Sequence, residues 1–138
     1  MGSTGAAIVP ALMKQVTAWA RNGNYYDVII KGTNPLTEHF GAFRANVPIA
    51  GAPETQLNTS LIDKLKGFDR ILLAGEAKSH CVANSVKQLF GYADIIQKLV
   101  ILGDCMSNVP GFEQIAVPIY DEALQMGAKI INVNEVNF

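Results

Sequence analysis

The first part of the chain shows two patterns in its apolar positions. Over residues 8–20 the apolar side chains recur at helical spacing, and Asn22-Gly23 ends the pattern, so we predict an amphipathic helix. Residues 27–32 form a short β-branched run closed by glycine. That run predicts a buried parallel strand with Lys31 at its C-terminal end.

Helices and strands alternate regularly through the rest of the chain. After a long loop over residues 33–54, the expected elements are a helix capped by Asn58 or Thr59 and running to Leu65, a buried strand 70–75, a helix 81–90, a strand 98–102, a helix 118–126 and a strand 129–133. This alternation predicts a single α/β domain, residues 1–138, with a mostly parallel sheet and flanking helices. Chemistry in such a domain gathers where the C-terminal strand ends meet the loops.

Composition and charge narrow the class of partner. Hydrophobic residues make up 49% of the 138 and charged residues 17%, which is typical of a globular domain. The 11 basic and 12 acidic residues are scattered, so nothing predicts a nucleic-acid footprint or a basic membrane-binding face. The apolar runs are too short to span a bilayer, and the first residues lack a signal-peptide pattern. We therefore expect a soluble cytoplasmic protein without nucleic-acid or membrane partners.

Cysteines and histidines are too few for a disulfide framework or a metal site. The chain has two of each, Cys81 and Cys105, His39 and His80, with neither CxxC nor HxxxH spacing. We expect reduced thiols and no metal held by this chain alone.

Cys81 is the candidate nucleophile. It follows the strand 70–75 near the start of the next helix, where unpaired backbone N–H groups favour a thiolate. Lys31, at the end of the predicted strand 27–32, could face Cys81 and stabilise the anion. Two alternatives stay open: Cys81 as a small buried hydrophobe, and Lys31 as a solvated lysine.

Other residues near these strand ends have more than one interpretation. His80 is adjacent to Cys81 in sequence, so its side chain should point elsewhere, and we interpret it as lining the mouth of the site. Phe40 and Phe43, in the long loop, either bind substrate or anchor the loop on the core. His39, in the same loop, either contributes to a ligand pocket or is exposed.

The loop after the strand 98–102 offers weaker candidates. Asp104 is expected to cap the next segment or to hold a loop through its carboxylate, and Cys105 to be passive. Lys78 has no predicted partner and no assigned role.

Two stretches resemble a known family. The segment VIIKGTNPLTEHFGAF is similar to the strand, catalytic lysine and following loop of the isochorismatase-like cysteine hydrolases, which are related to nicotinamidases. The segment RILLAGEAKSHCV is similar to their glycine, cis-peptide turn and nucleophilic cysteine. GSTGAAIVPAL and LVILGDCMSNV resemble flanking segments, so the similarity covers nearly all of the chain. The resemblance implies the isochorismatase-like fold, a Rossmann-like arrangement of three layers.

The resemblance also implies roles for individual residues. Cys81 would be the nucleophile of a Cys-Lys-Asp triad, and Lys31 would favour its thiolate. A cis peptide would precede Ala77, and the N–H groups of Ala77 and Cys81 would form an oxyanion hole.

Part of the family pattern has no counterpart in this sequence. The triad aspartate of the family ends the first strand in a DxQ-type motif, and the region that binds a metal in nicotinamidases is unmatched too. We therefore expect an N-terminally truncated chain that lacks the first strands. Zinc or another divalent metal would then belong to the full-length protein.

The leading functional hypothesis is a cysteine hydrolase that cleaves the C–N bond of a small amide, with nicotinamide the favoured substrate. The alternative is a catalytically inactive fragment or degenerate homologue that acts as an oligomerising or binding module, because the expected aspartate has no counterpart. We also expect a homo-oligomer. A generic nucleotide-binding domain ranks last, since neither GxGxxG nor GxxxxGK[ST] follows a strand.

Overall fold

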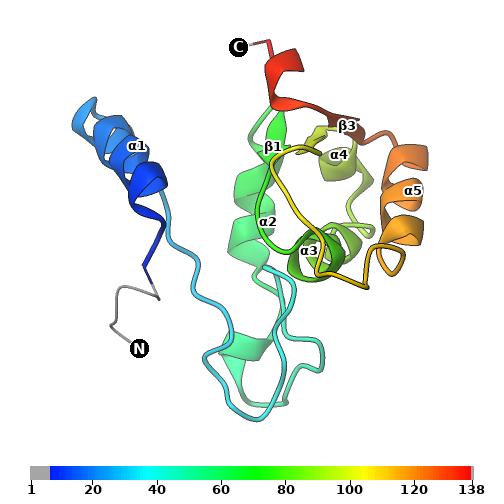
Figure 1. The fold of residues 1–138 in the computed structure, drawn as a ribbon. Coiled ribbons are helices and arrows are strands. Elements are labelled where there is room, and N and C mark those ends of the chain that lie inside the picture. Colours follow the sequence, from blue (N-terminus) through cyan, green and yellow to red (C-terminus); the bar gives the residue numbers. More distant parts are fainter. Residues whose placement is uncertain (1–6, 138) are drawn as a thin grey trace. The chain divides into compact units, whose positions relative to one another are not determined.

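A computed structural model describes residues 7–137 and divides the chain into two compact units, Met1–Ile30 and Lys31–Phe138. The sequence predicts one domain over the same residues. All strands of the described chain, and all of its helices except α1, belong to the second unit (Figure 1).

Helix α1 (Pro10–Arg21) lies in the first unit and confirms the predicted amphipathic helix. Proline occupies its first turn, where the missing N–H costs nothing, and Gly23 follows its end with φ at 82°. None of its residues is buried, and Leu12 and Trp19 are exposed. The apolar face of α1 is therefore unpacked within its unit.

The prediction of a strand over residues 27–32 was wrong. These residues have no regular secondary structure, and Val28 is 70% exposed. A β-branched run becomes a strand only where a neighbouring strand completes its hydrogen-bond ladder, and no strand of the described residues pairs with this one. Lys31 accordingly belongs to an irregular segment.

The sheet of the second unit consists of β1 (Ile71–Leu73), β2 (Leu99–Leu102) and β3 (Lys129–Ile131), in the order β1-β2-β3. Both pairs are parallel, with Leu72 opposite Val100, which confirms the coarse α/β prediction. All four residues of β2 are buried. The prediction that 70–75 is a buried strand was wrong in extent and burial: β1 is shorter, and Leu72 is 38% exposed because β1 is an edge strand.

The helices and turns of the second unit flank and connect its strands, and a side-chain cap explains where α2 begins. The side chain of Asn58 caps α2 (Thr59–Lys66) by accepting a hydrogen bond from the Leu61 N–H at 3.0 Å, as the capping preference predicts. A π-helical turn, η3 (Lys78–Val82), leads directly into α3 (Ala83–Gln88). The remaining elements are the unpredicted α4 (Ala93–Ile96), the predicted α5 (Val117–Gln125), and two short 3₁₀ turns, η2 (Pro53–Thr55) and η4 (Val133–Glu135).

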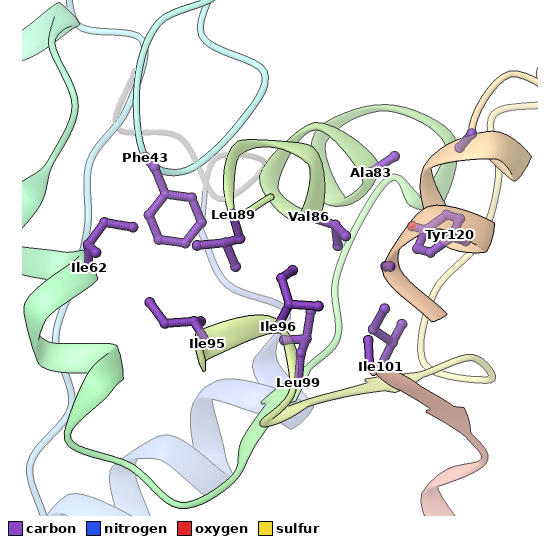
Figure 2. Packing of buried hydrophobic residues seen from close by; sticks show 13 residues of the cluster. Phe43, Ile62, Ala83, Val86, Leu89, Ile95, Ile96, Leu99, Ile101 and Tyr120 are labelled. Carbon is purple, nitrogen blue, oxygen red and sulfur yellow. The ribbon is translucent and has the colours of Figure 1, made fainter. Parts of the chain in front are cut away.

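One hydrophobic cluster holds the second unit together. Figure 2 shows Val86 of α3 facing Ile101 of β2, with Ile62 of α2 at one end of the cluster and Tyr120 of α5 at the other. Burial raises the pKa of Tyr120 to about 12, because a phenolate would be desolvated there. The cluster fixes α3, and with it the preceding η3, against the sheet.

We predict that Ile101→Ala lowers the free energy of unfolding by about 2–5 kcal/mol, because it removes a side chain that is 0% exposed and leaves a cavity. Chemical denaturation measures the change. The matched control is Ile115→Ala, whose parent side chain is 58% exposed, and we expect a change within about 0.5 kcal/mol. Equal effects of the two substitutions would contradict this assignment of the core.

Candidate active site

Two segments of the second unit build the candidate site: the irregular loop that begins at Lys31, and the turn from β1 through η3. Gly75 has φ at 140° where the chain leaves β1, and Gly32 has φ at 71° directly after Lys31. Only glycine adopts these angles readily. Both segments therefore change direction at glycines next to the candidate residues.

The structure brings Lys31 and Cys81 together. The Lys31 ammonium nitrogen Nζ lies 3.8 Å from Cys81 Sγ, and it donates hydrogen bonds to the carbonyl oxygens of His39 at 2.7 Å and Phe40 at 2.9 Å. Two neutral acceptors thus hold a positive charge beside the sulfur. Such a charge stabilises a thiolate over a thiol.

Side chains of α3 hold the loop that begins at Lys31 against η3 and α3. The Ser85 hydroxyl donates to the Cys81 carbonyl at 2.8 Å and accepts from the Ala42 N–H at 3.0 Å. Gln88 Oε1 accepts from the Phe43 N–H at 3.1 Å, and a Cβ added at Gly41 would collide with the Gln88 side chain. The loop therefore packs closely on α3, and these hydrogen bonds fix its position.

The turn before Cys81 is anchored by the segment that follows β2. The Glu76 carboxylate accepts hydrogen bonds from the Ser107 hydroxyl at 2.9 Å and the Ser107 N–H at 3.2 Å. The Lys78 N–H donates to the Ser107 carbonyl at 2.8 Å. Sequence reasoning missed Glu76 and Ser107, because the pairing joins residues 31 positions apart and has no local signal.

The Glu76–Ala77 peptide is cis, which confirms the bond geometry that the family resemblance implies. The Ala77 carbonyl accepts hydrogen bonds from the N–H groups of His80 and Val82, which close the π-helical turn. Within residues 7–137 no group accepts a hydrogen bond from the Ala77 N–H.

His80 lies between two aromatic rings. Its ring centroid is 6.5 Å from that of Phe40 and 5.2 Å from that of Phe112, both in edge-on geometry. Its Nδ1 is 2.9 Å from the Ser79 hydroxyl oxygen. The His80 ring is therefore packed among aromatic side chains, and its role as a lining residue stays a prediction. Sequence reasoning missed Phe112. Its only sequence signal as a candidate residue is an aromatic side chain in the loop after β2.

The two phenylalanines of the loop differ in exposure. Phe40 is 37% exposed and contacts His80, so its ring is available to line a site. Phe43 is 6% exposed and belongs to the hydrophobic cluster (Figure 2). Its position favours the anchoring interpretation over substrate binding.

The region after β2 contains the second thiol. Asp104 Oδ1 accepts a hydrogen bond from the Val133 N–H at 2.9 Å, which is the loop-holding role expected for it. Partial burial, and then the neighbouring Asp104 carboxylate, raise the pKa of Cys105. Cys81 and Cys105 are both free thiols.

Lys78 points away from this site. Its Nζ lies 5.7 Å from the centre of the Tyr120 ring, and both residues line a cavity of about 300 Å³ that includes neither Cys81 nor Lys31. The cavity is therefore separate from the thiol.

The described chain holds neither a metal-binding cluster nor a membrane-spanning helix. Across residues 7–137, no cluster of three or more histidine, cysteine, aspartate or glutamate side chains could hold a metal ion. No helix in the same range is long and apolar enough to cross a membrane. Comparison with family models, curated proteins and solved structures finds no match.

We predict that iodoacetamide alkylates Cys81 before Cys105 near neutral pH, because Lys31 faces only the former and the raised pKa of Cys105 keeps it protonated. Peptide mapping after brief labelling measures the order. Labelling of Cys105 should accelerate only as the pH rises through its elevated pKa. Preferential labelling of Cys105 at neutral pH would contradict the assignment of Cys81.

Proposed function

We propose that the second unit carries the nucleophile and its counter-charge for a cysteine hydrolase that cleaves the C–N bond of a small amide. The observation that carries the proposal is the contact of 3.8 Å between Lys31 Nζ and Cys81 Sγ. Ammonium and thiol groups from distant segments meet here at a loop-lined surface, as nucleophilic catalysis requires.

Covalent catalysis follows from this pair. The Cys81 thiolate attacks the amide carbonyl carbon, so that an S–C bond forms and the carbonyl π electrons move to oxygen. When the C=O bond re-forms, the C–N bond breaks and its electron pair leaves on nitrogen, which takes a proton and departs as ammonia. Water then attacks the thioester, releasing a carboxylic acid and regenerating the thiol.

The oxyanion of the tetrahedral intermediate needs donors near Cys81. The N–H of Ala77 has no acceptor among residues 7–137, which supports its role as one donor. The N–H of Cys81 is the proposed second donor. Removing one such donor typically costs about a hundred- to a thousandfold in rate.

A row of aromatic rings supports the proposed substrate class. Phe40, His80 and Phe112 form a row of edge-on rings, and Phe40 is partly open to solvent. A flat aromatic ring such as that of nicotinamide packs well against such a row. Nicotinamide is therefore the substrate we favour.

The mechanism also needs a group that transfers protons. In the described residues, no carboxylate is hydrogen-bonded to Cys81 or Lys31. The family resemblance implies that an aspartate supplies this function, and it also implies a divalent metal. General acid–base help of this kind is worth about a hundred- to ten thousandfold.

We predict that pyridine-3-carbaldehyde, the aldehyde analogue of nicotinamide, forms a reversible tetrahedral adduct with Cys81. An aldehyde has no leaving group, so the adduct needs the nucleophile and the pocket but not amine departure. With the aldehyde carbon ¹³C-labelled, NMR should show a tetrahedral thiohemiacetal signal, distinct from that of the free aldehyde hydrate. Cys81→Ala should abolish it, and the matched control Cys105→Ala should keep it. A signal that survives Cys81→Ala would sink the proposed mechanism.

We further predict little ammonia release from nicotinamide by the 138 residues alone. Adding an N-terminal segment that ends a strand in Asp-x-Gln should raise the rate by about a hundredfold or more. Ammonia release by the two forms, with and without Cys81→Ala, measures this. Full turnover by the shorter form would show that the aspartate is not required.

A second candidate function, an oligomerising module without catalysis, is favoured by one observation. Exposed apolar side chains lie on the edge strand β1 (Leu72, 38% exposed) and in the irregular segment before Lys31 (Val28, 70%, and Ile30, 76%). Sedimentation equilibrium separates the candidates when read with the aldehyde experiment. A defined oligomer that forms no adduct would favour the module.

A further inference from the structure

His39 contacts Lys31 and its neighbour in two ways. Its backbone carbonyl accepts a hydrogen bond from the Lys31 ammonium at 2.7 Å, and its ring nitrogen Nδ1 accepts one from the Gly32 N–H at 3.3 Å. One residue therefore holds both the charged end of Lys31 and the backbone that follows it.

We propose that His39 is a positioning residue of the candidate site, whose ring closes the loop from Gly32 to His39 and thereby keeps the Lys31 ammonium against Cys81. The inference rests on the proposed function and adds a residue to its machinery. His39 acts through Lys31 and does not touch the thiol.

The backbone around Lys31 has few other anchors. No backbone–backbone hydrogen bond within residues 7–137 involves Lys31 or Gly32, and the preceding residues pair with no strand. The far end of the loop is held separately, because the Phe40 N–H donates to Asn46 Oδ1 at 2.9 Å. The Gly32–His39 hydrogen bond therefore joins a weakly held segment to a fixed one.

The tautomer of His39 follows from this contact. Because Nδ1 accepts a hydrogen bond, the neutral ring carries its proton on Nε2. Burial, and then the charge of Lys31, lower the pKa of His39, which keeps the ring neutral and Nδ1 able to accept.

Nε2 itself is a buried atom without a hydrogen-bond partner in the described chain. An unpaired buried donor opposes stability. Stabilisation of the fold is therefore a poor explanation for a histidine here. Positioning of Lys31 requires only the hydrogen bond at Nδ1. It therefore accounts for a histidine at this position although Nε2 has no partner.

The test measures the alkylation rate of Cys81 by iodoacetamide in the full chain carrying Cys105→Ala. His39→Leu removes the Nδ1 acceptor at similar size, and His39→Asn restores an acceptor oxygen near that position. We expect His39→Leu to slow alkylation near neutral pH by up to about tenfold, because a displaced Lys31 ammonium no longer stabilises the attacking thiolate. His39→Asn should recover the parent rate to within about threefold.

A double-mutant comparison separates positioning from a structural role. If His39 acts through Lys31, His39→Leu should have no further effect once Lys31→Met is present. His39→Ala serves as a second acceptor-free variant if His39→Leu unfolds, and denaturation curves check the stability of each variant. A general structural role would slow alkylation equally in both backgrounds.

Three results would overturn the inference: an unchanged rate in His39→Leu, no recovery in His39→Asn, or an undiminished His39→Leu effect beside Lys31→Met. Failure of the proposed function looks different, since the parent chain would form no aldehyde adduct. A parent that forms the adduct and depends on Lys31 but not on His39 would reject this inference alone.

Discussion

The contact between Lys31 and Cys81 is the constraint on which the candidate site depends. It joins residues 50 positions apart, and neither lies in a strand. An ammonium group close to a sulfur has an effect only if it stays there, since a lysine side chain free in solvent samples many rotamers and its charge is screened. The surrounding hydrogen bonds supply that restraint: two carbonyl acceptors hold the Lys31 nitrogen directly, and the Ser85 hydroxyl ties the loop to the Cys81 backbone.

The fold positions this contact through helix packing rather than through the sheet alone. The buried face of α3 fixes η3 against the hydrophobic cluster, while Glu76 and Ser107 tie the preceding turn to the segment after β2. Cys81 is thus held from two directions. A π-helical turn at this place is consistent with function, because such turns occur often at functional sites.

Local signals in the sequence predicted the elements of the second unit well. Asn58 caps α2 as its side chain suggests, and the apolar run of β2 forms the buried central strand. The segment 27–32 failed as a strand because its β-branched residues specify a strand only with a paired neighbour. The candidate residues Lys31, Cys81, Phe40 and His80 came from position and resemblance. Ser85, Gln88 and Ser107 were missed because their partners are distant in sequence, and a hydroxyl or amide side chain carries no signal of such a partner.

The most direct test of this account is the rate at which iodoacetamide alkylates Cys81 at neutral pH, in Cys105→Ala chains with and without Lys31→Met. The Lys31 ammonium lies 3.8 Å from the sulfur and should favour the reactive thiolate, so alkylation should be slower when Lys31 is replaced. Equal rates in the two chains would mean that the ammonium does not stabilise the sulfur anion, and would contradict the central claim.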